Sequence, residues 1–166
     1  MCHSLSREMI QIVRIKMKTK AEAAGSRACW FVGAVIDGED QVDRFIEEGI
    51  WETGYTEKYR DLVNSVKPGD RIAIKATYTR KNDLPFDNRG TMVSTMVIKA
   101  TGRVTENPGN GHSLRVDWTE PDEPREWYFY TNRSAVWRVL PGKWMADALI
   151  GFAFDNAQQN YDRFRN

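Results

Sequence analysis

The stretch Val42-Asp-Arg-Phe-Ile-Glu-Glu-Gly-Ile-Trp51 decides how this chain can fold. Val42, Phe45 and Ile46 recur at the spacing of one helix face. Gly49 stands where helices commonly end in a left-handed residue, a conformation that glycine adopts without strain. The pattern therefore predicts a helix that stops before the Ile-Trp pair and leaves the tryptophan in a loop.

The segments on either side predict a strand before this helix and a second helix after it. Cys29-Trp-Phe-Val-Gly-Ala34 is an apolar run of strand length. The acidic residues of Asp37-Gly-Glu-Asp40 suit the positive end of a helix dipole, so they predict where the first helix begins. An apolar stripe from Tyr59 to Val66 predicts the second helix, and Lys67-Pro-Gly-Asp70 predicts the turn that ends it.

Beyond Arg71 the apolar period changes from that of a helix to that of a strand. Ile72 and Ile74 begin an alternation that predicts a strand as far as Tyr78. The polar stretch from Thr79 to Gly90 predicts a long loop. Further strands are predicted over Met92–Val104, Leu114–Trp118, Trp127–Thr131 and Val136–Leu140, and a third helix over Lys143–Phe154.

These elements predict a single α+β domain over residues 28–166. We expect its twisted mixed sheet to curl into a small barrel flanked by about three helices. The small and polar residues of Lys20-Ala-Glu-Ala-Ala-Gly-Ser-Arg27 are typical of a linker. Residues 1–27 are therefore expected to form a flexible lead-in.

Composition excludes several classes of protein. The 166-residue chain is long enough for a sizeable core, and its 41% hydrophobic and 28% charged content is that of a globular protein. Its two cysteines cannot form a disulfide framework, and no apolar run reaches the roughly 18 to 20 residues of a membrane span. We expect a cytoplasmic protein that is monomeric as an isolated domain. An acidic excess from Asp37 to Asp61 and a basic excess from Arg71 to Arg103 permit nucleic-acid binding.

Motifs for catalysis or metal binding are sparse. The histidines are His3 and His112, and the pair His112-Ser113 lacks the third member of a triad. Zinc needs about three or four ligands of this kind, and no glycine-rich phosphate loop occurs. We expect a binding domain that is not an enzyme and holds neither metal nor cofactor. Two other classes stay open: a hydrolase with paired carboxylates facing one pocket, and a protein-interaction domain with no concave site at Trp51.

Aromatic residues share the predicted loops with arginine and lysine. Trp51 and Tyr55 follow the first helix, Tyr78-Thr-Arg-Lys81 enters the long loop, and Trp137-Arg138 lies near Arg133. A nucleobase needs a flat face to stack on, while its phosphates need cations. The combination favours a site for an unpaired nucleotide.

Longer motifs resemble a known family. The stretch Val42 to Trp51, preceded by Trp30-Phe-Val32 and followed by Leu114-Arg-Val-Asp-Trp118, resembles the YTH and EVE group of PUA-like domains. The stretch from Cys29 to Asn166 is similar to the EVE-like N-terminal module of McrB-type modification-dependent restriction proteins. This second likeness is carried by Gly49-Ile-Trp-Glu-Thr-Gly-Tyr55, Pro68-Gly-Asp-Arg-Ile-Ala-Ile-Lys75, Leu84-Pro-Phe-Asp-Asn-Arg-Gly90 and Arg125-Glu-Trp-Tyr-Phe-Tyr130.

The resemblance implies a module that flips a methylated base out of DNA into an aromatic pocket. Trp51 would stack on the base, and the backbone carbonyl of Glu52 would accept a hydrogen bond from its exocyclic amine. Asp37 is expected as a further edge acceptor or, alternatively, as the N-cap of the first helix. The other expected walls are Trp30, Tyr78, Phe86 and Trp137, and the expected phosphate contacts are Lys75, Arg80, Lys81, Arg89, Arg133 and Arg138.

The resemblance also implies partners. These are DNA carrying a modified base, a McrB-type GTPase domain in the same polypeptide, and a McrC-type nuclease subunit. The base stays open: the McrB likeness favours 5-methylcytosine or 5-hydroxymethylcytosine, and the likeness to an aromatic cage favours N6-methyladenine. An RNA-binding PUA-like or ASCH-like domain is the alternative function.

Overall fold

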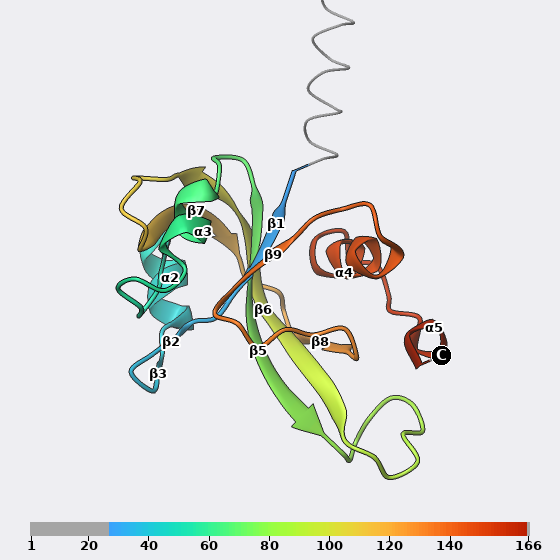
Figure 1. Ribbon diagram of the computed structural model, residues 1–166. Coiled ribbons are helices and arrows are strands. Elements are labelled where there is room, and N and C mark those ends of the chain that lie inside the picture. The colour runs from blue at the N-terminus through green and yellow to red at the C-terminus, as the bar shows by residue number, and fades with distance from the viewer. Residues whose placement is uncertain (1–26, 166) are drawn as a thin grey trace, which may run out of the picture.

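The computed structural model describes residues 27–165 of the chain (Figure 1). The predicted lead-in over residues 1–27 therefore lies, apart from Arg27, outside the described residues. In chain order the elements are β1 (Cys29–Val32), β2 (Val35–Ile36), β3 (Glu39–Asp40), α2 (Val42–Glu48), β4 (Ile50–Glu52), α3 (Arg60–Ser65), β5 (Arg71–Arg80), β6 (Val93–Glu106), β7 (Ser113–Thr119), β8 (Arg125–Tyr128), β9 (Val136–Val139), α4 (Trp144–Phe154) and α5 (Tyr161–Arg165).

One mixed sheet organises the described residues. Its strand order is β4-β7-β6-β5-β1-β9, and β8 pairs with β6 off this path. β1 runs parallel to β5, whereas the other pairs of this sheet are antiparallel. The sheet curls into a half-barrel (Figure 1). The predicted α+β class and curled mixed sheet are thus confirmed, and α5 is a helix that the sequence pattern did not predict.

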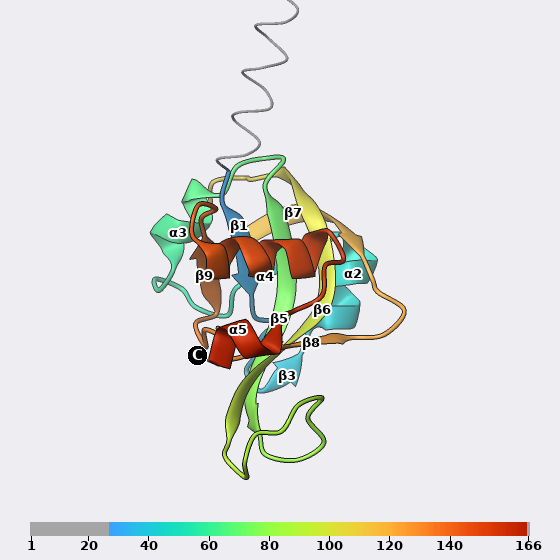
Figure 2. The same ribbon diagram turned by 90° about the vertical axis from the view of Figure 1, so that its right-hand side faces the viewer.

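Helices cover the sheet from two sides, and a separate apolar core lies under each. α2 and α3 lie on one side, while α4 and α5 lie on the other (Figures 1 and 2). Because side chains alternate along a strand, β1 contributes to both cores: Trp30 and Val32 to the first, Cys29 and Phe31 to the second. Within residues 27–165, no helix is both long and apolar enough to cross a membrane.

The segment before α2 differs from its prediction. Asp37 and Gly38 form the turn of the short β2–β3 hairpin, with φ angles of 52° and 81°. An Asp-Gly pair favours such a turn because both positions need positive φ. The expectation that Asp37 caps the helix is therefore wrong. Asp40 takes a capping role instead, because its Oδ1 accepts a hydrogen bond from the backbone amide of Val42 at 2.9 Å.

The long β5–β6 hairpin extends away from the body of the molecule (Figure 1). The loop at its tip begins after Arg80, slightly later than predicted. Asn88 orders this loop by donating to the backbone carbonyls of Lys81 and Thr91. Phe86 fixes the loop to the body through contacts with the rings of Tyr128, Phe129 and Tyr161.

Gly102 in β6 gives a direct test of this packing. A Cβ at this position would collide with the backbone oxygen of Asp117 and lie 2.9 Å from Cγ1 of Val116. We expect Gly102→Ala to lower the unfolding free energy by about 1 to 3 kcal/mol, as overpacking does, measured by urea denaturation. Gly33→Ala is the control, because its Cβ would come no closer than 3.8 Å to Ala135. Equal stability of the two variants would contradict the β6–β7 packing.

Candidate functional site

A pocket of about 320 Å³ opens beside the end of β1. Four chain segments line it: residues 33–35 after β1, residues 51–55 in and after β4, residues 74–77 of β5, and residues 133–135 before β9. Asp40 and Lys99 complete the lining. Its volume lies near the lower end of the range for small-molecule sites. We call it the β1–β4 pocket.

Trp51 forms an inner wall of this pocket, but its side chain is not open to solvent. Only 1% of the residue is exposed, and it belongs to the core under α2 and α3. Its indole Nε1 donates a hydrogen bond of 2.9 Å to the carbonyl of Gly33. It also lies in β4 rather than in a loop. The expectation of a free indole face is therefore wrong, since the ring is buried in the core under α2 and α3.

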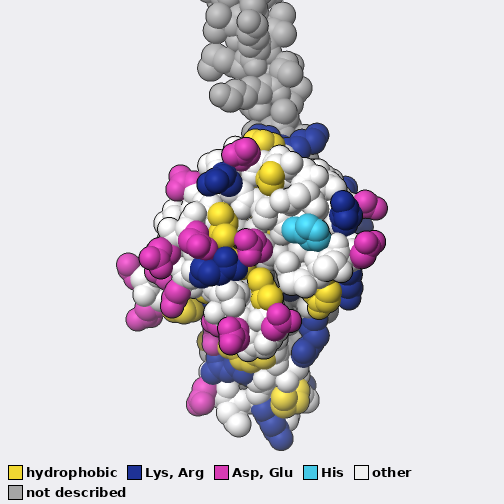
Figure 3. Space-filling model, turned by 90° about the vertical axis from the view of Figure 1, so that its left-hand side faces the viewer, with side chains coloured by type: hydrophobic (Ala, Val, Ile, Leu, Met, Phe, Trp, Pro, Cys, Tyr) yellow, Lys and Arg dark blue, Asp and Glu magenta, His cyan; other side chains and the backbone are white. Residues whose placement is uncertain are grey.

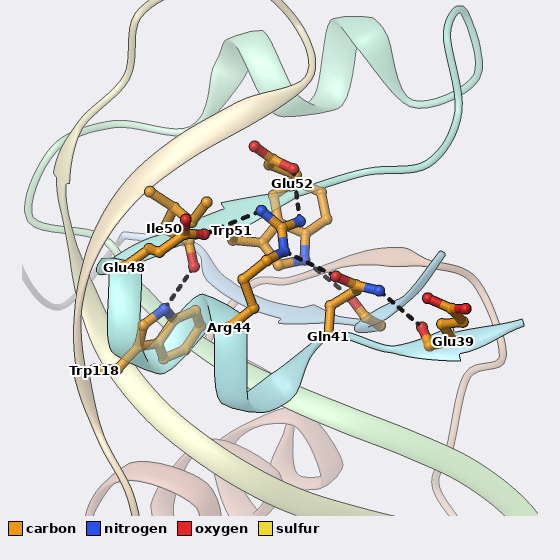
Figure 4. A network of polar contacts seen from close by, with 9 residues as sticks. Glu39, Gln41, Arg44, Glu48, Ile50, Trp51, Glu52 and Trp118 are labelled. Carbon is orange, nitrogen blue, oxygen red and sulfur yellow. Dashed lines mark hydrogen bonds and ion pairs between the residues drawn. The ribbon is translucent and has the colours of Figure 1, made fainter. Parts of the chain in front are cut away.

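A polar network from α2 holds β4 at the pocket (Figure 4). The guanidinium of Arg44 donates to the carboxylates of Glu52 (2.8 Å) and Glu48 (3.1 Å) and to the side-chain oxygen of Gln41 (2.8 Å). The indole of Trp118 in β7 also donates a hydrogen bond of 2.8 Å to the carbonyl of Ile50 in β4. The Glu52 carboxylate is thus committed to positioning the strand.

The backbone of Glu52 is placed differently from its side chain. β4 is an edge strand whose neighbour is β7. The Thr53 amide donates to the His112 carbonyl at 2.9 Å, so this opposed pair is hydrogen-bonded. Bonded and non-bonded pairs alternate in an antiparallel ladder, and Glu52 lies opposite Ser113 in the next pair. The N–H and C=O of Glu52 therefore point away from β7, toward the open edge of the sheet.

Lys75 lies in the wall of the pocket and is 5% exposed. Its ammonium donates hydrogen bonds to the backbone carbonyls of Asn132 and Ser134, the latter at 2.8 Å. Thr77 donates to the same Asn132 carbonyl at 3.1 Å. Burial lowers the pKa of Lys75 to about 8, because desolvation disfavours the charged form. Lys75 thus holds the loop before β9 and is not on the surface where the sequence analysis expected a phosphate contact.

A β-bulge brings a second lysine to the pocket. The β5–β6 register shifts between Ile74 and Lys75, which leaves Lys99 as the extra residue of β6. Bulges re-aim side chains, and they are common beside functional sites. The Lys99 ammonium lies 3.4 Å from the carboxylate of Asp40 in β3, so an ion pair joins β6 to the β2–β3 hairpin at the pocket.

Tyr55 is the exposed aromatic residue of the pocket lining, with 47% of its surface accessible. Its ring packs edge-on against Tyr59, with the centroids 5.5 Å apart, and the Lys58 ammonium lies 5.3 Å from its centroid. Nδ1 of His112 lies 3.2 Å from the backbone oxygen of Tyr55. Arg133 is exposed on the loop before β9. Tyr55 was noted in the sequence as an aromatic residue beside the first helix, but it was not among the expected cage walls.

The other expected walls do not converge on this pocket. Trp30 is buried, donates from its indole to the Asp70 carboxylate at 3.1 Å, and lines a second hollow together with Arg138. Trp137 packs against Phe31, which belongs to the core under α4. Trp30 and Trp137 therefore lie on opposite faces of the sheet and cannot enclose one base. This corrects the cage inferred from the resemblance.

Tyr78 and Phe86 lie along the β5–β6 hairpin and its loop, apart from the lining of the β1–β4 pocket. The Tyr78 hydroxyl donates to the Glu126 carboxylate at 2.9 Å, and Arg80 forms an ion pair with the same carboxylate. The guanidinium of Arg80 is thus already paired with a carboxylate of the protein itself. Lys81 and Arg89 are exposed on the hairpin loop, as a phosphate contact requires.

Charges of both signs cover the face that carries α2 and the β2–β3 hairpin. Figure 3 shows acidic side chains gathered on this face, with Lys and Arg among them. The acidic excess predicted from Asp37 to Asp61 thus lies beside the pocket. A polyanion would meet less repulsion from carboxylates on the side of Arg133 and the hairpin loop than on this face.

Two carboxylates, those of Asp40 and Glu52, belong to residues that line the same pocket. Each is already bonded to a cation, Asp40 to Lys99 and Glu52 to Arg44. Among residues 27–165 there is also no cluster of three His, Cys, Asp or Glu side chains suited to a metal ion.

Comparison of the chain with protein-family models and with curated proteins finds no match. The residues of the β1–β4 pocket supply one exposed aromatic ring, a buried lysine, an exposed arginine and an edge-strand carbonyl.

Proposed function

We propose that this chain is a PUA-like module of the EVE and YTH kind that recognises a modified base in DNA. The observation that carries the proposal is the β1–β4 pocket, which combines the exposed ring of Tyr55 with the open backbone edge at Glu52. Flat rings stack on nucleobases, and backbone carbonyls accept from exocyclic amines. The pocket thus offers both elements that binding of an extruded base requires.

The aromatic residue that contacts the base is Tyr55 rather than Trp51. Stacking needs an accessible ring face, and Trp51 is 1% exposed whereas Tyr55 is 47% exposed. Trp51 instead supports the pocket from inside through its bond to Gly33. Extruding a base costs a few kcal/mol, and stacking returns about 1 to 3 kcal/mol. Phosphate contacts must supply the remaining affinity.

The exposed lysine and arginine side chains provide the phosphate contacts. Arg133 lies at the pocket, and Lys81 and Arg89 lie on the hairpin loop. Arg138 borders the second hollow beside Trp30 and not the β1–β4 pocket, so we assign it no contact with the same DNA segment. A module with so few phosphate contacts binds weakly, and its affinity falls as salt rises.

Weak single-site binding suits a protein that acts as an oligomer. In a McrB-type system the GTPase domain forms the oligomer and a McrC-type subunit cleaves DNA. Several copies of the module on one assembly would then raise the overall affinity through effective concentration. In this proposal the chain supplies specificity to a GTP-dependent restriction system, while GTP hydrolysis and DNA cleavage belong to other parts of that system.

The test is a binding titration with oligonucleotides that differ only in one base: cytosine, 5-methylcytosine, adenine or N6-methyladenine. We expect Tyr55→Ala to weaken binding of the preferred modified DNA about 10-fold, because a lost stacking contact costs about 1 to 3 kcal/mol. Tyr55→Phe keeps the ring and is expected to retain binding. Fluorescence anisotropy at two salt concentrations provides the measurement.

The control is Trp144→Ala, which removes an exposed aromatic residue (37% accessible) from α4, on the other side of the sheet. It is expected to leave DNA affinity unchanged. The proposal fails if Tyr55→Ala and the wild type bind all four oligonucleotides alike. Tighter binding of matched structured RNA would instead support the RNA-binding alternative.

A further inference from the structure

The second hollow has a volume of about 540 Å³ and shares no lining residue with the β1–β4 pocket. It lies where β1 begins, beside the turn that joins α3 to β5 (Figure 1). Its lining comes from the start of β1, the end of α3, that turn and β9, namely Arg27, Ala28, Trp30, Ser65, Lys67, Asp70 and Arg138. The proposed function uses none of these side chains.

Cations outnumber acids in the lining of the second hollow. Arg27, Lys67 and Arg138 are positively charged, and Asp70 is the acidic residue among the lining residues. Lys67 and Arg138 are exposed, and neither forms an ion pair within residues 27–165. Charge of one sign on a concave surface raises the local concentration of ions of the opposite sign. The second hollow is therefore suited to an anion.

The carboxylate of Asp70 is already engaged within the protein. Asp70 is 4% exposed, and Oδ2 accepts hydrogen bonds from the indole of Trp30 at 3.1 Å and from the backbone amide of Lys67 at 2.9 Å. Oδ1 forms an ion pair with Nε of Arg27 at 3.2 Å. Because Arg27 balances the charge of Asp70, the charges of Lys67 and Arg138 remain uncompensated.

Arg27 is held in position by the turn before β5. Its Nη2 donates to the carbonyl of Pro68 at 2.5 Å, and its guanidinium lies against Gly69, where a Cβ would come within 2.7 Å of Nη1. Gly69 has a φ of 91°, so glycine suits both the backbone of this turn and the close approach of the arginine. Among the described residues Nη1 has no hydrogen-bond partner. An arginine fixed in this way loses little side-chain freedom when a ligand binds.

We propose that the second hollow binds a phosphate monoester. Such a group carries about two negative charges at neutral pH, which match the uncompensated charges of Lys67 and Arg138, whereas a phosphodiester carries one. The guanidinium groups of Arg27 and Arg138 have the fork geometry that fits phosphate oxygens. The volume lies in the range of small-molecule sites, so the hollow has room for the esterified group as well.

This inference does not depend on the proposed function, because it concerns a different part of the surface. Two sources supply the same chemistry: a small phosphorylated metabolite, or the phosphorylated end of a nucleic acid. In both, the ligand is recognised through a terminal phosphate rather than through a base.

The experiment is a calorimetric titration of the full chain with ribose 5-phosphate at low salt. Ribose 5-phosphate carries the monoester but no base, so it offers nothing to stack on Tyr55. We expect Lys67→Ala and Arg138→Ala each to weaken binding about 10-fold, the loss that follows from removing one hydrogen bond between charged groups. Circular dichroism reports whether each variant is folded, and both side chains are exposed.

Arg115→Ala is the matched control. It removes an exposed arginine of β7 that lines neither the second hollow nor the β1–β4 pocket. It is expected to leave the affinity for ribose 5-phosphate unchanged. Weakening by Arg115→Ala equal to that by Arg138→Ala overturns the inference, because it would report only the net charge of the chain. Binding that neither Lys67→Ala nor Arg138→Ala weakens also overturns it.

Further ligands test the charge of the anion and its source. Dimethyl phosphate, a diester, is expected to bind about 10-fold more weakly than ribose 5-phosphate, since it offers one charge fewer. An oligonucleotide with a 5′-phosphate is compared with the same oligonucleotide without it. Tighter binding of the phosphorylated form, lost in Arg138→Ala, assigns the hollow to a nucleic-acid end. Binding of ribose 5-phosphate without that difference assigns it to a small ester.

Three other results overturn the inference. They are equal binding of the monoester and the diester, binding of inorganic phosphate without binding of ribose 5-phosphate, and no binding of any of these ligands. Tighter binding of tetraglutamate than of ribose 5-phosphate would also overturn it and would assign the hollow to an acidic peptide. The base-binding proposal is unaffected by each of these outcomes, because its test is the titration with Tyr55→Ala.

Discussion

Trp51→Ala is expected to lower the unfolding free energy by about 3 to 5 kcal/mol, the cost of removing a large buried aromatic side chain. Trp51 is 1% exposed, and its indole bond to Gly33 ties β4 to the end of β1. Loss of the ring leaves a cavity in the core under α2 and α3 and frees the Gly33 carbonyl. Urea denaturation followed by circular dichroism gives the free-energy difference.

Trp51→Phe is the matched control for that experiment. Phenylalanine keeps much of the buried area but lacks the N–H donor, so a smaller loss than for Trp51→Ala is expected. A cost below about 1 kcal/mol for Trp51→Ala would contradict the burial of the ring. Trp51→Ala is for the same reason an ambiguous probe of base stacking, since weaker DNA binding by this variant would also follow from loss of the fold. Tyr55→Ala avoids that ambiguity.

The pH dependence of stability is the second large effect, and it comes from Lys75. Burial lowers its pKa from 10.5 to about 8 in the folded protein. Between these two pH values the unfolded state binds more protons than the folded state, so stability rises with pH. The rise amounts to about 3 kcal/mol between pH 7 and pH 10.5 at most, at 1.36 kcal/mol per pH unit of pKa difference.

The measurement is the difference in unfolding free energy between the wild type and Lys75→Met at several pH values. Taking the difference cancels the titration of tyrosines and other groups that both proteins share. We expect the wild type to gain on the variant across this range and the gap to be constant below pH 7. If the unfolding free energy of the wild type minus that of Lys75→Met falls or does not change as the pH rises, the ammonium is solvated.

The sequence predicted the strands of this fold better than the contacts of its site. A period-two pattern identified β5, and an apolar run identified β1, because those signals depend on burial of alternate or successive residues along one chain segment. The short β2–β3 hairpin was missed because the acidic residues around Asp37 were interpreted as a helix start. The Asp37-Gly38 pair was the signal for a turn. α5 has no buried residue to set a helical period.

The site was harder to predict because it depends on pairings far apart in sequence. The pattern around Trp51 shows that the ring follows a helix, but its burial depends on β7 and on the carbonyl of Gly33. The sequence does not show that Lys75 faces inward, because only its pairing with the loop near Asn132 compensates the buried charge.

The position of β1 has a consequence for how the protein is made. β1 lies between β5 and β9, and Cys29 pairs with Val139 as well as with Arg71. Contacts between such distant residues form slowly, and β1 finds its second neighbour in the sheet only after β9 has been synthesised. On the ribosome, the nascent domain is therefore expected to leave the apolar edge of β1 uncovered until translation has passed β9, and to need chaperone protection during that interval.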